Sequence, residues 1–241
     1  MRRENEKTQK KELKKALFII TSHTELGDTG KKTGFYYEEL ATPYWTLLDA
    51  GYAIDISSIQ GGAATADPGS LKADDELPAS VRRFLDDKAS VAKVKNSIVI
   101  SSINPDDYKI VFLPGGHGTM WDFAQSEDLA SVISKAYENG AIIGSICHGT
   151  AGLLKARDAK GLPLLKDKRI NSFTASEEIA VNCDRIVPYV LENEIRKLGA
   201  IYQCTENFKP YVLTHGRIVT GQNPASCALV SAALIEAAKT H

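Results

Sequence analysis

The chain has 241 residues, 43% of them apolar and 24% charged, which are ordinary proportions for a globular protein. Its 29 basic and 30 acidic residues leave a formal net charge of -1, so charge gives no reason to expect nucleic acid or an anionic membrane as a partner. No apolar run approaches the roughly 20 residues that a membrane helix needs.

The first 15 residues are rich in charge and nearly free of apolar side chains. Such a segment cannot bury apolar surface, and we expect residues 1–15 to form a flexible arm. The arm has no aromatic residue, which argues against a role in nucleic-acid binding. No linker rich in proline or glycine divides the remainder, so residues 16–241 are predicted to form a single domain.

The first half of this domain alternates between strand-like and helix-like patterns. In chain order we expect a strand at 16–21, a helix at 35–50 with a kink or restart at Pro43, a strand at 52–58, a turn-rich loop at 61–70 and short helices within 71–100. We interpret residues 59–107 as an insertion that caps the site.

The second half continues the alternation. The predicted elements are strands at 108–114 and 141–147, helices at 125–139 and 148–156, a strand near 168–173, helices around 176–182 and 188–198, short strands at 200–204, 211–215 and 217–221, and a closing helix at 223–239. Two strands, "YKIVFLP" and "AIIGSIC", are apolar throughout, which indicates burial on both faces. We therefore predict an α/β fold with a mostly parallel central sheet and helices on both faces.

Active sites of such folds lie at the carboxyl ends of the strands. The loops that leave the two apolar strands are "PGGHG" (114–118) and "CHGTAG" (147–152). In a parallel sheet both loops reach the same rim, and they lie close together if their strands are neighbours.

The four cysteines are scattered and form no CxxC pair, so the sequence predicts neither a metal site nor a redox pair. His23 and Asp28 lie close in sequence but lack a third ligand at useful spacing. Free thiols in a chain of this length are typical of a reducing cytosol, and we expect a cytoplasmic protein. Three of the thiols are interpreted as structural or surface groups: Cys183, Cys204 and Cys227.

Cys147 allows two interpretations. Free cysteine is among the most buried residue types and is usually inert. Here a strand-to-helix junction, the small neighbours Gly144 and Gly149, and an adjacent histidine favour a thiolate nucleophile exposed on a tight turn. Adjacent side chains seldom face each other, so His148 can act as a base only if the turn folds its ring back. Its backbone N–H and that of Gly116 suit an oxyanion hole.

Four stretches resemble one family: "KKTGFYYEELATPY", "FLPGGHGTMWD", "GSICHGTAGLL" and "VTGQNPAS". Together they resemble the ThiJ/PfpI superfamily and, within it, the branch of glutathione-independent glyoxalases (glyoxalase III) and stress chaperones. The Cys-His elbow is shared across the superfamily, whereas the other stretches are more specific to this branch. The resemblance implies a flavodoxin-like three-layer α/β sandwich, a homodimer and no organic cofactor.

The resemblance also implies roles for individual residues. Cys147 matches the nucleophile, and His148 matches the histidine beside it. Glu39 matches a carboxyl group that touches the cysteine sulfur. Gly116 and His148 match the two backbone amides of the oxyanion hole.

The acidic third member of the triad matches Glu178, with Glu177 as its rival. Both have an alternative interpretation as ordinary acids in the first turn of a helix. His117 and Trp121, in and after the "GGHGT" turn, are candidates for the pocket wall.

The implied reaction converts methylglyoxal or glyoxal into the 2-hydroxy acid without metal, nicotinamide or glutathione. A thiolate adds to the aldehyde, a base moves the proton of the former aldehyde carbon, and water cleaves the resulting thioester. Glu39 can take part only if burial raises its pKa. Glycated proteins are an additional candidate substrate.

Two other functions fit the same residues. A hydrolase could use the thiol, the histidine and the acid to cleave peptides or amides. A chaperone would hold unfolded proteins on an exposed apolar patch, with Cys147 acting at most as an oxidation sensor.

Overall fold

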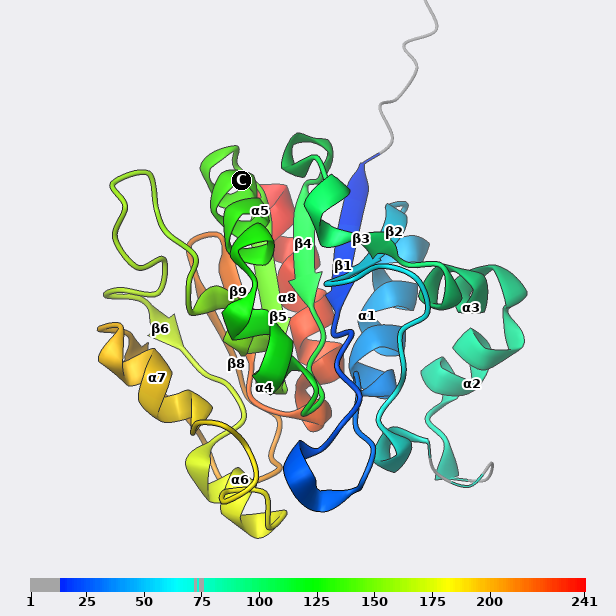
Figure 1. Cartoon of the computed structure of the whole chain (residues 1–241). Helices are drawn as coiled ribbons and strands as arrows, with labels where there is room; N and C mark the ends of the chain where they lie inside the picture. The colour runs from blue at the N-terminus through cyan, green and yellow to red at the C-terminus, as the bar shows by residue number, and fades with distance from the viewer. Residues whose placement is uncertain (1–13, 72, 74–75) are drawn as a thin grey trace, which may run out of the picture.

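The computed structural model describes residues 14–71, 73 and 76–241 (Figure 1). Within these residues seven strands form one sheet in the order β3-β2-β1-β4-β5-β9-β8. Neighbouring strands are parallel, except that β8 runs antiparallel to β9. The strands are β1 (Lys15–Ile20), β2 (Ala53–Ser58), β3 (Ile98–Val99), β4 (Ile110–Leu113), β5 (Ile142–Ile146), β8 (Val212–His215) and β9 (Ile218–Gly221).

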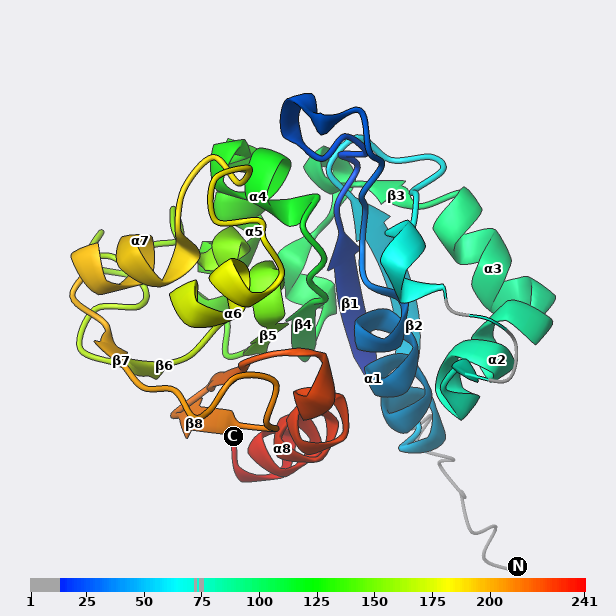
Figure 2. The same ribbon diagram turned by 90° about the horizontal axis from the view of Figure 1, so that it is seen from below.

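Helices cover both faces of the sheet (Figure 2). One face packs against α1 (Tyr37–Asp49), which is continuous through Pro43, and α8 (Cys227–Thr240). The other face packs against α5 (Glu127–Glu138) and, beside it, α4 (Thr119–Asp122) and α7 (Leu191–Lys197). Because β4 and β5 lie between these layers, every residue in both strands is buried. The predicted three-layer α/β architecture is confirmed.

The remaining elements are short. They are α2 (Ala79–Asp86), α3 (Lys88–Lys95), α6 (Ala175–Ala180), and the strands β6 (Arg169–Ile170) and β7 (Ile201–Tyr202). Short 3-10 helices occupy Gly27–Thr29, Pro68–Ser70, Ile100–Ser102, Pro105–Asp107, Phe123–Gln125 and Pro224–Ser226. The strands predicted near 168–173 and 200–204 do form, but they pair with each other as β6 and β7, outside the central sheet.

The predicted N-terminal arm lies mostly outside the described residues, which begin at residue 14. Its last residue, Lys15, is instead the first residue of β1 and is paired with Ala53. Strand pairing uses the main chain, so a charged side chain does not prevent it. The Lys15 ammonium lies 3.6 Å from the Asp55 carboxylate of the neighbouring strand β2.

The segment 59–107 is divided between two places. Its loop around Asp67 and Gly69 lines the cavity that holds Cys147, and the N–H of Phe35 donates to the Thr65 carbonyl at 3.1 Å. Further along, α2 and α3 pack beside α1 and β2, and β3 extends the sheet next to β2. Among the described residues of the segment, the part that reaches the site is therefore the loop around Asp67.

The carboxyl ends of the parallel strands point downward in Figure 1, and the loops after β4 and β5 meet there. The Thr119 hydroxyl lies 2.9 Å from the carbonyl oxygen of Gly116 and 3.0 Å from that of His148, so it links both loops. The chain after β5 winds as a 3-10 helix (Cys147–Leu153), where an α-helix at 148–156 was predicted. Glycine at two of these positions weakens the preference for an α-helix.

Gly149 permits this contact between the two loops. A Cβ atom at Gly149 would lie 2.1 Å from the carbonyl oxygen of Leu113, closer than the two atoms can approach. We therefore expect Gly149→Ala to lower the free energy of unfolding by about 3 kcal/mol, measured by urea denaturation. Gly140→Ala is the matched control, because its positive φ is strained but no atom lies within 4 Å of the added carbon. It should cost about 1 kcal/mol, and an equal cost for both variants would contradict the collision.

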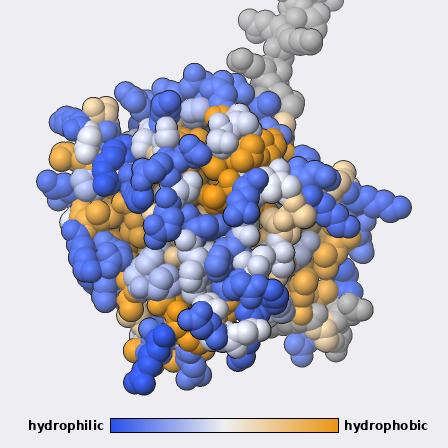
Figure 3. All heavy atoms as spheres, in the orientation of Figure 1, coloured by the Kyte–Doolittle hydropathy of each residue, from blue (hydrophilic) through white to orange (hydrophobic). Residues whose placement is uncertain are grey.

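Figure 3 shows that hydrophilic residues cover much of one face of the molecule, with apolar residues in separate patches between them. Among the described residues, no helix has the length and apolar content required to cross a membrane.

Candidate active site

Cys147 sits where β5 ends and the 3-10 helix begins. Its φ of 56° lies in the left-handed region, which is unfavourable for a residue with a side chain and is typical of strained turns at functional sites. The side chain is only 4% exposed, so it is buried rather than displayed on the surface as predicted. It reaches a cavity of about 270 Å³, here called the Cys147 cavity.

The ring of His148 is folded back onto the sulfur. Its Nδ1 lies 3.3 Å from Sγ of Cys147, and its Nε2 lies 2.8 Å from Oε2 of Glu178. The other carboxylate oxygen, Oε1, lies 2.7 Å from Nε2 of His117. Cysteine, histidine and glutamate thus form a continuous chain of contacts, and one carboxylate bridges two imidazole rings.

Glu178 and Glu177 are adjacent in α6 but point to different partners. The Glu177 carboxylate closes a capping box with Thr174 and accepts from the Phe208 N–H at 2.8 Å and from Nδ2 of Asn223 at 2.7 Å. These contacts hold it away from the ring of His148. The structure therefore brings Glu178, and not its rival, against His148.

Glu39 approaches the sulfur from α1. It is fully buried, and its Oε2 accepts a hydrogen bond from the Gly115 N–H at 2.7 Å. Burial raises the pKa of Glu39 to about 8, although hydrogen bonds from Cys147 and Gly115 partly oppose the rise. Glu39 therefore has the raised pKa without which it could not take part in the predicted reaction.

Cys147 is a protonated thiol in the resting protein, whereas a thiolate was predicted from the sequence. Burial, and next the negative charge of Glu39, raise the pKa of the Cys147 thiol. Burial, and next the nearby charge of His117, lower the pKa of His148, so its ring is neutral. A neutral ring with Nε2–H donating to Glu178 leaves the Nδ1 lone pair facing the thiol. The geometry thus favours a thiol that gives up its proton to His148 at the moment of attack.

Two side chains at the end of this series of contacts are charged: Glu178, within the triad, and His117, beside it. Burial alone would raise the pKa of Glu178, but the electrostatic interaction with His148, hydrogen bonds from His117 and His148, and the charge of His117 lower it well below its usual range. Burial alone would lower the pKa of His117, but hydrogen bonds to Cys183 and Glu178 raise it to about 10. Glu178 is consequently an anion and His117 a cation at neutral pH.

Two backbone amides border the sulfur. Gly116 lines the Cys147 cavity with a φ of 106°, and a Cβ there would lie 2.3 Å from the Gly34 carbonyl oxygen. The N–H of His148 lies next to Cys147 and lowers the pKa of its thiol in part. Gly116 and His148, whose amides were predicted to form an oxyanion hole, therefore both line the cavity that holds the sulfur.

Glu39 should make the stability of the fold depend on pH. Its pKa is raised from 4.5 to about 8, so between these values the unfolded chain has lost a proton that the folded chain retains. Stability therefore falls as pH rises through this window. The free energy of unfolding of Glu39→Gln is compared with that of the parent at pH 5 and at pH 8. The difference should shift in favour of the variant by roughly 3 kcal/mol between the two pH values.

Urea denaturation at the two pH values measures this difference. Glu38→Gln changes the neighbouring and partly exposed carboxylate, which raises the pKa of Glu39 less than burial does, so this variant should retain most of the pH slope of the parent. A Glu39→Gln variant with the parental slope would show that the carboxyl group ionises normally.

Of the two predicted wall residues, His117 lines the Cys147 cavity and Trp121 does not. Trp121 lies in α4, where its ring stacks on His23 with centroids 5.0 Å apart. Phe173 and Phe208 supply aromatic walls in its place, and sequence analysis missed both. No local sequence pattern identifies these two residues as walls of the cavity, because they reach it only through the packing of the segments around α6.

A cluster of potential metal ligands lies here, although no metal site was predicted from the sequence. His117, Glu178 and Cys183 each offer one ligand atom, and these atoms lie within 4.8 Å of one another. His117 lies 61 residues before Glu178 in the sequence, so the three residues form no local ligand motif.

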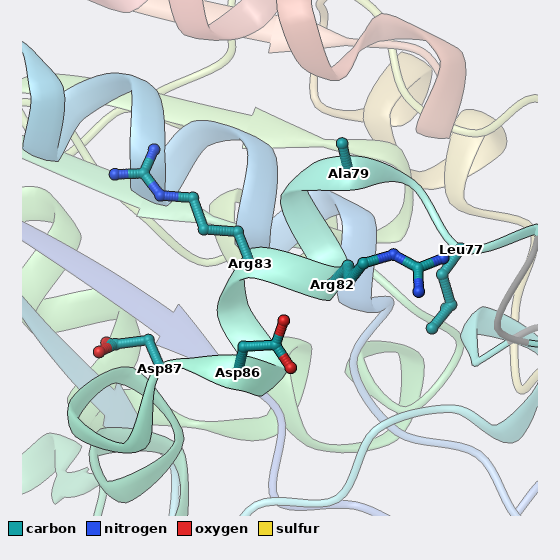
Figure 4. Close-up of a pocket in the computed structure, with 6 residues that line it drawn as sticks. All are labelled: Leu77, Ala79, Arg82, Arg83, Asp86 and Asp87. Carbon is teal, nitrogen blue, oxygen red and sulfur yellow. The ribbon is translucent and has the colours of Figure 1, made fainter.

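A larger, open cavity of about 590 Å³ lies beside α2 (Figure 4). The side chains drawn there are mostly charged surface groups, and they include none of the predicted site residues. Arg83 is paired with Asp49 at 3.0 Å and lies 3.8 Å from the centre of the Trp45 ring. This cavity holds no nucleophile, and the candidate site remains the Cys147 cavity.

Comparison with known proteins places these residues in a family context. The model of the DJ-1/PfpI family matches residues 32–237. The chain is 33% identical over 238 residues to the "Glutathione-independent glyoxalase HSP31" of Saccharomyces cerevisiae, covering 94% of this chain and 98% of that protein. It also resembles the crystal structure of glyoxalase III from Candida albicans, with a TM-score of 0.86, 31% identity, and coverage of 94% and 98%. A further neighbour is the Rapid Encystment Protein 24 KDa of Francisella tularensis, with a TM-score of 0.89, 33% identity, and coverage of 94% and 99%.

Proposed function

Since the chain belongs to the DJ-1/PfpI family, we propose that it is a glutathione-independent glyoxalase that converts 2-oxoaldehydes such as methylglyoxal into 2-hydroxy acids. The observation that carries the proposal is the position of Cys147 between His148 and Glu39, with His148 held by Glu178. Relatives that align with nearly the whole chain bear the name of this activity.

The reaction begins at the sulfur. Sγ of Cys147 bonds to the aldehyde carbon while the thiol proton passes through Nδ1 of His148 to the former aldehyde oxygen, which gives a hemithioacetal. The developing negative charge on that oxygen is stabilised by the N–H groups of Gly116 and His148. Glu178 stabilises the imidazolium while His148 carries the proton.

A proton then moves between the two substrate carbons. A base beside the sulfur removes the proton from the former aldehyde carbon, an enediol forms, and a proton is returned to the former ketone carbon. The first carbon is oxidised to a thioester and the second is reduced to an alcohol, so no external oxidant is needed. Glu39 suits this step because a pKa of about 8 lets it take and return a proton near neutral pH. Water finally cleaves the thioester and restores the thiol.

The Cys147 cavity suits a small substrate. Its volume of about 270 Å³ is below the range usual for drug-sized ligands. Phe173, Val181 and Phe208 give it apolar walls, while the polar groups gather around the sulfur. A short aldehyde fits this division, with its carbonyl groups at the sulfur and its alkyl group against the aromatic rings.

Incubation of the purified protein with methylglyoxal in the absence of glutathione tests the proposal. We expect one lactate for each aldehyde consumed, measured by an enzymatic lactate assay, and no acceleration on addition of glutathione. A protein that forms no lactate under these conditions does not have this activity.

One observation favours a second candidate, a cysteine hydrolase. The contacts from Cys147 through His148 to Glu178 are those that thiol peptidases use to activate their nucleophile. Aminopeptidase and amide substrates should then be cleaved clearly above background. Lactate formation without any such cleavage would leave the glyoxalase alone.

Exposed apolar side chains favour a holding chaperone as an additional role. Ile179, Val181 and Phe208 are 61%, 39% and 45% exposed, and the last two also line the Cys147 cavity. If they bind unfolded proteins, Cys147→Ala should still suppress aggregation of a heated client in full. The proposal further includes glycated proteins as substrates, a cytoplasmic location and a homodimer, and light scattering after size exclusion measures the last of these.

A further inference from the structure

One imidazole and one thiol converge on the carboxylate of the triad, beside the Cys147 cavity. They belong to His117 after β4, Glu178 in α6, and Cys183 in the turn after α6. We propose that these three side chains form a binding site for a zinc-type divalent cation, and that an ion bound there inhibits turnover.

The geometry is close to that of a metal site. Tetrahedral zinc with bonds of about 2.0–2.3 Å holds its ligand atoms roughly 3.3–3.8 Å apart. The ligand atoms of His117, Glu178 and Cys183 all lie within 4.8 Å of one another, so the most distant pair needs to close by about 1 Å. Rotation of side chains can supply a movement of that size.

Access to the site comes from the Cys147 cavity. The His117 side chain is 20% exposed and lines that cavity, whereas the Glu178 side chain and Cys183 are buried. An ion can therefore enter beside His117 and meet the two buried ligands. Three protein ligands and one position open to the cavity form the arrangement in which zinc binds water or an exchangeable ligand.

The donor atoms select the class of ion. Imidazole nitrogen and thiolate sulfur are preferred by zinc and similar borderline or soft metals, whereas magnesium and calcium require oxygen ligands. One carboxylate and one thiolate also balance the two positive charges of the ion. We therefore expect zinc to bind, and magnesium to leave the site empty.

Occupation of this site acts directly on the triad. Glu178 uses Oε1 toward His117 and Oε2 toward His148, so an ion that takes Oε1 draws electron density from the group that orients His148. The ring of His117 lies 4.2 Å from that of His148, which places the ion near the ring that must accept the thiol proton. The charge of Glu178 that stabilises the His148 imidazolium is then shared with the ion, which should slow attack by Cys147.

Equilibrium dialysis of the full chain against zinc chloride, followed by metal analysis, measures binding directly. We expect one tightly bound zinc per chain, and affinity at least about 100-fold weaker in Cys183→Ala and Cys183→Ser. Cys204→Ala removes an exposed thiol as a matched control and should bind zinc like the parent. Parental affinity in a folded Cys183 variant, verified by circular dichroism, would overturn the site. Cys183→Ser nearly preserves the volume of the side chain for the case in which alanine disturbs the fold.

Cobalt identifies the thiol that binds. A thiolate bonded to Co²⁺ gives a charge-transfer absorption band in the near ultraviolet. This band should be present in the parent and in Cys147→Ala, and it should be lost in Cys183→Ser. A band that depends on Cys147, or the absence of any band, contradicts the proposed ligand set.

The inhibition experiment rests on the proposed glyoxalase activity, whereas the binding measurements do not. A failure of the proposed activity can therefore be distinguished from a failure of the metal site. Zinc should lower the rate of lactate formation by the parent, and a chelator should restore it. The rate of each protein with zinc is compared with the rate of the same protein without zinc. The inhibition constant should be at least about 100-fold larger in Cys183→Ser than in the parent, in line with the weaker binding of zinc. Zinc that binds and leaves the rate unchanged would refute the inhibition.

Discussion

Replacing Cys147 with alanine should reduce the conversion of methylglyoxal to lactate by at least about 10³-fold, to the level of the reaction without protein. The substitution removes the only described thiol that borders the Cys147 cavity together with His148 and Glu39. No other atom at this place can form the hemithioacetal, so the loss should appear in kcat rather than in KM. The lactate assay with saturating aldehyde measures it.

Two controls separate the loss of chemistry from the loss of structure. Cys204→Ala removes a thiol that is exposed, whereas the thiol of Cys147 is buried. This variant should leave the rate of lactate formation unchanged. Mass spectrometry of the parent, quenched during turnover, should show one substrate equivalent attached at Cys147. A Cys147→Ala protein that forms lactate at the parental rate would place the reaction elsewhere.

Replacing Glu178 with glutamine should lower kcat by about 10²–10³-fold while the protein remains folded. The amide retains the shape of the side chain but removes the negative charge that stabilises the His148 imidazolium and fixes its Nε2–H. Since His148 must accept the thiol proton, the loss of that charge raises the barrier to attack. Steady-state kinetics at one pH, with the fold checked by circular dichroism, measures the effect.

Glu177→Gln is the matched control, because it changes the neighbouring carboxylate of the same helix. Glu177 holds the cap of α6 and the side chain of Asn223, so its replacement should cost about 1–2 kcal/mol of stability. The folded fraction should retain a kcat within a few-fold of the parent. The opposite pattern, with the larger kinetic loss at Glu177, would reassign the third member of the triad.

Much of the fold can be predicted from two apolar runs. The sequences that become β4 and β5 are apolar at nearly every position, which predicts burial on both faces and a parallel sheet. Their adjacency in the sheet then brings the two glycine-rich loops together, as expected. β3 could not be predicted, because a strand of two exposed residues has no periodic pattern.

The candidate site divides in the same way. Cys147, His148 and Gly116 lie in loops that directly follow buried strands, so local sequence is enough to place them at one rim. The choice of Glu178 over Glu177 depends on the direction of α6, and the proximity of Cys183 to His117 depends on the path of the chain after it. No local sequence pattern predicts the direction of α6 or the path of the chain after it, because both follow from tertiary packing. The burial that keeps Cys147 protonated is likewise a property of the assembled walls.

The contact between Glu178 and His148 has a consequence for the chain during synthesis. The residues that surround the sulfur come from α1, from the loops after two central strands and from α6, so they are distant in sequence and meet only through long-range contacts. Such contacts form late in folding. A growing polypeptide that has not yet produced α6 therefore carries an ordinary, unactivated cysteine at 147. The complete series of contacts from Cys147 through His148 to Glu178 is therefore present only once the C-terminal part has joined the rest.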